Sequence, residues 1–97
     1  MAIKVIVELQ AKPGKRAELT SLLQSVEARF GSSQPGFLGS TYYEVLDNSD
    51  IMVEIADWES AEIRAAAMQQ AMASGAYAHL GDLLAAPFRA TVVSQLP

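Results

Sequence analysis

Three side chains of this sequence, His79, Tyr77 and Trp58, are of types that can bind and deprotonate an aromatic molecule. His79 is the only histidine, and its imidazole has an ordinary pKa of about 6.5, which makes it the obvious candidate for a base near neutral pH. The Tyr77 hydroxyl can hydrogen-bond an anionic oxygen. Trp58, the only tryptophan, offers an indole ring for stacking and an N–H donor. We therefore assign a catalytic role to these three residues.

Each of these residues also has a purely structural interpretation. His79 fits an exposed helix position without a role, Trp58 fits a core anchor beneath the following helix, and Tyr77 fits packing of a short helix on a sheet. Met68 and Met72 are assigned here to substrate binding, because flexible thioether side chains can shape an adaptable cavity. Core packing explains the two methionines equally well.

The hydrophobic periodicity predicts the elements that position these residues. Strands are predicted where apolar residues alternate, over residues 3–9, 37–46, 51–58 and 88–95. Helices are predicted from helical spacing or alanine-rich composition, over residues 19–30, 61–73 and 76–85. Ser60 is the expected N-cap of the second helix, and Gly31 is the expected C-terminal cap of the first. Residues 47–50 are the expected hairpin turn, and residues 32–36 the expected loop.

This order of elements predicts a single α+β domain over residues 1–97. Strand, helix, strand, strand, helix, strand is the split βαβ plan of a ferredoxin-like βαββαβ fold. Two helices would cover one face of a four-stranded antiparallel sheet. The chain length is typical of one compact domain with one core.

The uncovered face of the predicted sheet is the place where a second copy of the chain would bind. Ile6 and Val93 lie there beside polar residues, and a mixed apolar face of this kind usually acquires a partner. We therefore predict a homodimer that packs sheet to sheet. Tyr42 and Tyr43 point to opposite faces, so only the tyrosine on the helix side can reach a cavity within one chain. Tyr43 is the tyrosine that we assign to substrate binding.

Composition excludes several classes of protein. Seven Lys and Arg against eleven Asp and Glu give a net charge of −4 without runs, which argues against nucleic-acid binding. The absence of cysteine and the single histidine argue against disulfides and a zinc site. No apolar run approaches transmembrane length and no signal peptide is visible, so we expect a cytoplasmic protein that does not enter a membrane.

Three short motifs resemble the antibiotic biosynthesis monooxygenase (ABM) family of dimeric α+β barrels. Residues 11–15 (AKPGK) are similar to the opening turn of that family, residues 34–37 (QPGF) to its E-P-G-C/F entry to the second strand, and residues 57–60 (DWES) to its E-W-E-S junction. The similarity covers nearly the whole chain. The resemblance implies a homodimeric monooxygenase that oxidises an aromatic, phenolic or quinol-type small molecule with molecular oxygen and without a cofactor or metal.

The sequence also departs from the family pattern. Members often carry S-P-H-F after the second long helix, whereas residues 74–77 here are SGAY, with Ala76 at the histidine position and His79 three residues later. Val7 and Ala71 stand where the haem-degrading branch has two of its characteristic residues, which disfavours that branch. Two other functions stay compatible with the sequence: a non-catalytic binding or regulatory dimer, and an isomerase or cyclase on the same scaffold.

Overall fold

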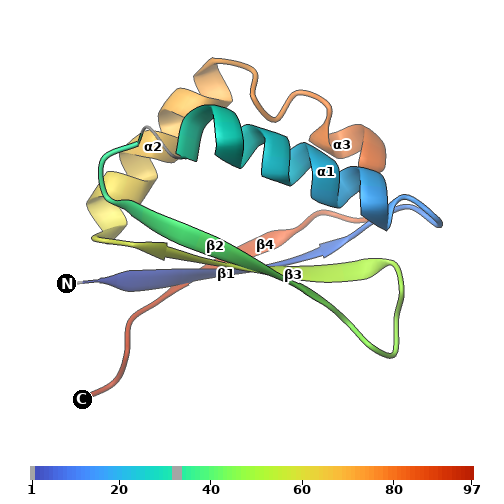
Figure 1. Ribbon diagram of the computed structural model, residues 1–97, viewed down its shortest axis with the longest axis horizontal. Coiled ribbons are helices and arrows are strands. Elements are labelled where there is room, and N and C mark those ends of the chain that lie inside the picture. Colours follow the sequence, from blue (N-terminus) through green and yellow to red (C-terminus); the bar gives the residue numbers. More distant parts are fainter. Residues whose placement is uncertain (1, 32–33) are drawn as a thin grey trace.

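The structure, a computed structural model, describes residues 2–31 and 34–97, so Ser32 and Ser33 of the predicted loop lie outside the described residues. The elements follow one another in the predicted order (Figure 1). Their bounds are β1 (Ile3–Gln10), α1 (Arg16–Val26), a π-helical turn η1 (Glu27–Gly31), β2 (Phe37–Glu44), β3 (Ile51–Trp58), α2 (Ala61–Ala73), α3 (Leu80–Leu83) and β4 (Arg89–Val93).

The four strands form one antiparallel sheet in the order β2-β3-β1-β4, which confirms the predicted ferredoxin-like fold. The central strands β1 and β3 pair along their whole lengths, from Ile3 opposite Trp58 to Gln10 opposite Ile51. Figure 1 shows the helices on one face of the sheet and the other face uncovered. Any cavity enclosed by this chain alone must therefore lie between the sheet and the helices.

The junction from β3 to α2 is held by a helix cap and by a close backbone approach. The Ile63 N–H donates to the Ser60 Oγ at 3.2 Å, which confirms the predicted N-cap. Gly36 lies beside this cap, and its carbonyl accepts from the Glu59 N–H at 2.8 Å. Gly36 has φ +87°, and a Cβ at this position would come within 2.7 Å of the Ile63 side chain. Only glycine satisfies both conditions without a shift of the backbone or of α2.

Two predictions of helix extent are wrong. The helix predicted over residues 76–85 is only the four residues of α3, because the chain after it pairs with the end of β1 instead. The Lys12 N–H donates to the Leu83 carbonyl and the Ala85 N–H to the Gln10 carbonyl, both at 2.8 Å. Gly31 does not cap α1 as predicted, because the backbone continues from α1 into η1 through that residue.

The core lies between the inner face of the sheet and the helices. Leu9 of β1 and Leu19 of α1 are 1% and 0% exposed, and both belong to one cluster with Met52 of β3. Trp58 is also buried and packs edge-to-face against Phe37, with ring centroids 5.0 Å apart at 61°. The predicted alternation of β1 and β3 therefore directs one face of each strand into the core.

The outer face of the sheet is partly apolar, as predicted. Ile6 and Tyr43 are 38% and 44% exposed, and Ile6 lies opposite Ile55 at the centre of this face. The homodimer expected on this face stays a prediction. Among the described residues, no helix combines the length and the apolar character needed to cross a membrane.

Candidate functional site

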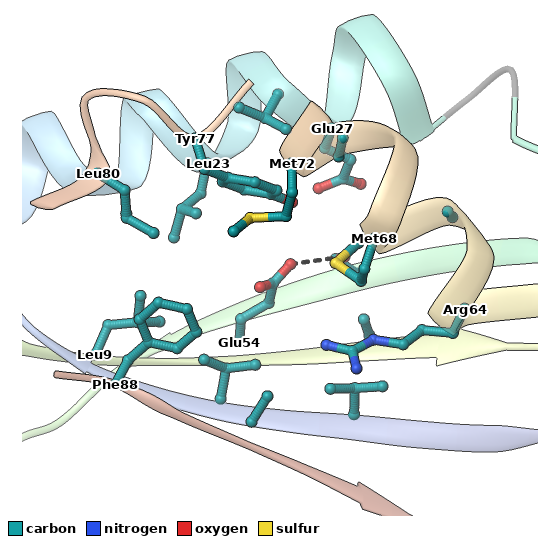
Figure 2. A pocket seen from close by; sticks show the side chains of 18 of the residues that line it. Leu9, Leu23, Glu27, Glu54, Arg64, Met68, Met72, Tyr77, Leu80 and Phe88 are labelled. Carbon is teal, nitrogen blue, oxygen red and sulfur yellow. Dashed lines mark hydrogen bonds between the residues drawn. The ribbon is translucent and has the colours of Figure 1, made fainter. Parts of the chain in front are cut away.

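A cavity of about 590 Å³ lies between the inner face of the sheet and the helices. Figure 2 shows Leu9, Leu23, Leu80 and Phe88 around this space. Its lining is largely aliphatic and aromatic, and its volume is within the range of small-molecule sites in proteins.

The carboxyl group of Glu54 points into this cavity from the sheet (Figure 2). Strand alternation places Glu54 on the inner face with Ala56 and Trp58. The Ser40 hydroxyl donates to Glu54 Oε2 at 3.1 Å. Burial raises the pKa of Glu54 and the negative charge of Glu27 adds to this, whereas the hydrogen bond from Ser40 acts in the opposite direction. A carboxylate with a raised pKa is a stronger base than an exposed one.

Tyr77 and Arg64 reach into the same space as Glu54. In Figure 2 the Tyr77 ring lies on the helix side of the cavity, across from the Glu54 carboxylate, and the Arg64 guanidinium extends inward from α2. Burial raises the pKa of Tyr77, and the negative charge of Glu54 raises it further. Tyr77 therefore keeps its proton at neutral pH and can donate a hydrogen bond to a ligand oxygen.

A second carboxyl group, that of Glu27 in η1, also lines the cavity, as does the polar side chain of Gln34. The Tyr42 hydroxyl donates to Glu27 Oε2 at 2.7 Å, which ties η1 to β2. Tyr42 lies directly opposite Glu54 in the sheet. Burial, followed by the hydrogen bond to Glu27, raises the pKa of Tyr42, so this hydroxyl stays protonated.

The structure brings four of the six predicted site residues to the cavity. Trp58, Tyr77, Met68 and Met72 all line it. His79 does not line it: its side chain is 84% exposed, and its Nδ1 lies 3.7 Å from Asp82 Oδ2.

Tyr43, the remaining predicted substrate contact, is also away from the cavity. It lies opposite Val53 on the outer face of the sheet, whereas its neighbour Tyr42 is on the inner face. A chain neighbour in a strand always points to the other face, so the tyrosine on the helix side is Tyr42.

Glu54 and Arg64 also line the cavity and were not predicted from the sequence. The signal for Glu54 was its spacing of four residues before Trp58, because even spacings along a strand place two side chains on one face. Arg64 had no comparable signal, since helix α2 is rich in alanine and has no clear polar face. Within residues 2–31 and 34–97, no three His, Cys, Asp or Glu side chains are grouped as a metal ion would require.

These features define a class of protein: a ferredoxin-like α+β domain with a largely apolar, ligand-sized cavity that holds a partly buried carboxyl group. The family model for antibiotic biosynthesis monooxygenases matches residues 2–81. The chain therefore belongs to the antibiotic biosynthesis monooxygenase family, as its sequence motifs predicted.

Solved structures share this fold at low sequence identity. SnoaB, a cofactor-independent oxygenase from Streptomyces nogalater, matches with a TM-score of 0.83 and 21% identity over 99% of this chain and 94% of that chain. A conserved protein from Methanosarcina mazei Go1 matches with a TM-score of 0.85 and 19% identity over 99% of this chain and 94% of that chain. At such identities the likeness establishes the fold alone. No curated protein matches the chain in sequence.

Proposed function

We propose that the protein is a cofactor-independent monooxygenase that oxidises an aromatic small molecule of the phenol or quinol type with molecular oxygen. The observation that carries this proposal is the carboxyl group of Glu54 inside a largely apolar cavity of about 590 Å³, in a member of this family. Trp58 and Tyr77 line the same cavity and support the proposal. SnoaB, which shares the fold, is described as a cofactor-independent oxygenase.

The first step of the proposed reaction is removal of a proton from the ligand. The ligand O–H bond breaks, a new O–H bond forms on the Glu54 carboxylate, and the negative charge moves to the ligand oxygen. The resulting anion is electron-rich and can donate an electron to oxygen. The apolar walls limit access of water and so strengthen every electrostatic interaction with this anion.

The overall reaction balances without an external reductant when the substrate is a quinol. Oxidation of the quinol to a quinone supplies two electrons, and hydroxylation of one ring carbon supplies two more. These four electrons reduce one molecule of oxygen, so one oxygen atom enters the hydroxyquinone product and the other leaves as water. Trp58 and Tyr77 would hold the ring and its oxygen in place during these steps.

We assign the role of base to Glu54 instead of His79. An exposed imidazole outside the cavity cannot reach a ligand held inside it, whereas the Glu54 carboxylate faces the ligand space directly. The predicted contributions of Trp58, Tyr77, Met68 and Met72 are kept as part of the proposal.

The test is oxygen uptake with mass analysis of the product, using metal-free protein and a panel of quinols and polycyclic phenols. We expect Glu54→Gln to lower kcat/KM by about 100-fold or more, the usual contribution of a general base. His79→Ala should change kcat/KM by less than about twofold, because general acid–base catalysis requires contact with the ligand. Thermal denaturation of each variant shows whether it is folded.

Three results would change the proposal. Full oxygen uptake by Glu54→Gln would mean that Glu54 is not the base. A ligand that binds but is recovered unchanged in air would favour a non-catalytic binding protein. Product formation without oxygen uptake would favour an isomerase or cyclase.

The proposal includes a homodimer and a cytoplasmic location. Exposed apolar side chains on the outer sheet face, Ile6 among them, support sheet-to-sheet association. The acidic composition and the absence of cysteine are compatible with the cytoplasm.

A further inference from the structure

Arg64 places a positive charge at the cavity, and no salt bridge joins it to a carboxylate of residues 2–31 or 34–97. It lies in the first turn of α2, is half-buried, and lines the cavity. Among the described residues, no carboxylate oxygen comes within 4.0 Å of its guanidinium, although its charge favours the ionised form of Glu54. Figure 2 shows the guanidinium directed into the same space as the Glu54 carboxylate. A ligand between these two groups would touch both.

The charges around this space favour one distribution of protons. Glu27 and Glu54 are the acidic groups that line the cavity, Arg64 is the cation, and Tyr77 is a neutral donor. A ligand that enters as an anion would add a third negative charge opposite a single cation, which is unfavourable in a site of low polarity. A neutral hydroxyl compound brings no charge.

Transfer of the ligand proton to Glu54 leaves the total charge of the cavity unchanged. The Glu54 carboxylate becomes neutral and the ligand oxygen becomes negative. The Arg64 guanidinium then loses its attraction to Glu54 and would contact the ligand oxygen directly. A guanidinium can donate two parallel hydrogen bonds to an oxygen anion or to a pair of neighbouring oxygens. Such a contact would favour the ionised form of the bound ligand.

We propose that Arg64 binds the ligand oxygen that Glu54 deprotonates, so that the cavity accepts neutral phenols or quinols and holds them as anions. This inference rests on the proposed role of Glu54 as the base. It does not depend on a later reaction with oxygen. It therefore defines the substrate class by its protonation state, namely neutral in water and ionised when bound.

The test uses alizarin, a dihydroxyanthraquinone whose absorption band moves to longer wavelength when it ionises. Alizarin is titrated with pH in the presence of excess protein under argon, which prevents turnover. The variants are Arg64→Gln and Arg64→Lys, and Arg16→Gln serves as a matched control because Arg16 does not line the cavity. The dimethyl ether of alizarin has nearly the same shape but cannot ionise, so its affinity reports the shape of the cavity alone.

We expect bound alizarin to ionise at a lower pH than free alizarin. Arg64→Gln should raise the apparent pKa of the bound dye by about 1 or more, the usual effect of losing an adjacent opposite charge. Arg64→Lys should give an intermediate value, because it keeps the charge and loses the fork of donors. Arg16→Gln should match the wild type, and the dimethyl ether should bind all variants within about threefold, since none of these substitutions removes apolar lining.

The inference would be overturned if alizarin failed to bind, bound only in its neutral form, or kept the wild-type pKa in Arg64→Gln. Its failure can be separated from failure of the proposed function. Ionisation of the dye under argon together with no oxygen uptake on the substrate panel would keep the role of Arg64 and remove the oxygenase. Oxygen uptake on the substrate panel without ionisation of the dye would keep the oxygenase and remove the proposed role of Arg64.

Discussion

At Glu54 the position that suits a base in the cavity is also a position that disfavours the ionised carboxylate. At the wall of an apolar cavity an ionised carboxylate has less hydration than in water. Burial therefore raises the pKa of Glu54. The hydrogen bond from Ser40 and the positive charge of Arg64 offset only part of this effect. A group that is held at a cost in stability and that faces a ligand-sized cavity is characteristic of a functional site.

The raised pKa of Glu54 predicts a pH-dependent effect of Glu54→Gln on stability. Below the ordinary pKa of glutamic acid the carboxyl is protonated in both the folded and the unfolded chain, so it contributes no ionisation penalty. Above the raised pKa the folded chain carries the penalty of a partly buried charge. We expect the Tm of Glu54→Gln to exceed that of the wild type at about pH 8, and the two Tm values to converge at about pH 4. A difference in Tm that is the same at both pH values would contradict the prediction.

The hydrogen bond between Tyr42 and Glu27 gives a second prediction at the residue scale. Tyr42→Phe should lower the free energy of unfolding by about 1 to 2 kcal/mol, because it leaves a half-buried carboxyl without its donor. Tyr43→Phe is the matched control: among the described residues the Tyr43 hydroxyl makes no hydrogen bond, and its side chain is exposed. Urea denaturation measures both values. Equal losses in the two variants would contradict the assignment.

Two aromatic residues predicted from the sequence line the cavity, whereas residues that reach it through local geometry were not predicted. Trp58 and Tyr77 were chosen for ring stacking and hydrogen bonding, and both line the cavity. His79 was chosen for its intrinsic pKa, which says nothing about where the backbone directs the ring. Glu54 was overlooked because its ordinary pKa gives no sign of catalytic use until burial raises it.

At the scale of elements, the contact between Gly36 and α2 fixes one end of the cavity. Gly36 begins the approach to β2, and Ile63, which it touches, is the chain neighbour of Arg64. A shift of α2 at this contact would move the guanidinium relative to Glu54. The 34–37 motif therefore helps to fix the position of Arg64, the side chain proposed to bind the ligand oxygen.

Gly36→Ala should destabilise the protein more than Gly14→Ala. Both glycines have positive φ, +87° and +76°, so each substitution has a conformational cost of about 1 kcal/mol. A methyl group at Gly36 would also collide with Ile63 at 2.7 Å, whereas nothing lies within 4 Å at Gly14. Overpacking of this kind typically adds about 1 to 3 kcal/mol. Equal unfolding free energies of the two variants, measured in urea, would show that α2 adjusts without cost.

Helices and strands were predictable from the sequence where buried residues recur at a regular spacing. They were not predictable where tertiary contacts override the local preference of the chain. The alternation of β1 and β3 and the cap at Ser60 were evident, since each is a local pattern with a direct physical cause. The region of α3 was predicted as a longer helix from its alanine and leucine content. The structure uses its last residues to pair with residues 10–12, a contact that no local pattern reveals.

At the scale of the whole molecule, the uncovered, partly apolar face of the sheet predicts a homodimer. One charged substitution at the centre of this face should abolish the dimer. Ile6 and Ile55 face each other across β1 and β3 at the centre of this face. Ile6→Glu would place a carboxylate in the middle of the proposed interface, where it has no water and no partner. We expect light scattering to give a dimer for the wild type and a monomer for Ile6→Glu.

Ala65→Glu is the control for this prediction, because it adds the same charge at an exposed position of α2, on the helix side of the sheet. It should leave the dimer intact. A wild-type monomer, or a dimer that survives Ile6→Glu, would mean that the sheet face is not the interface. If the wild type is a monomer, the cavity of one chain must bind its ligand without a second copy, and the alizarin titration should be independent of protein concentration.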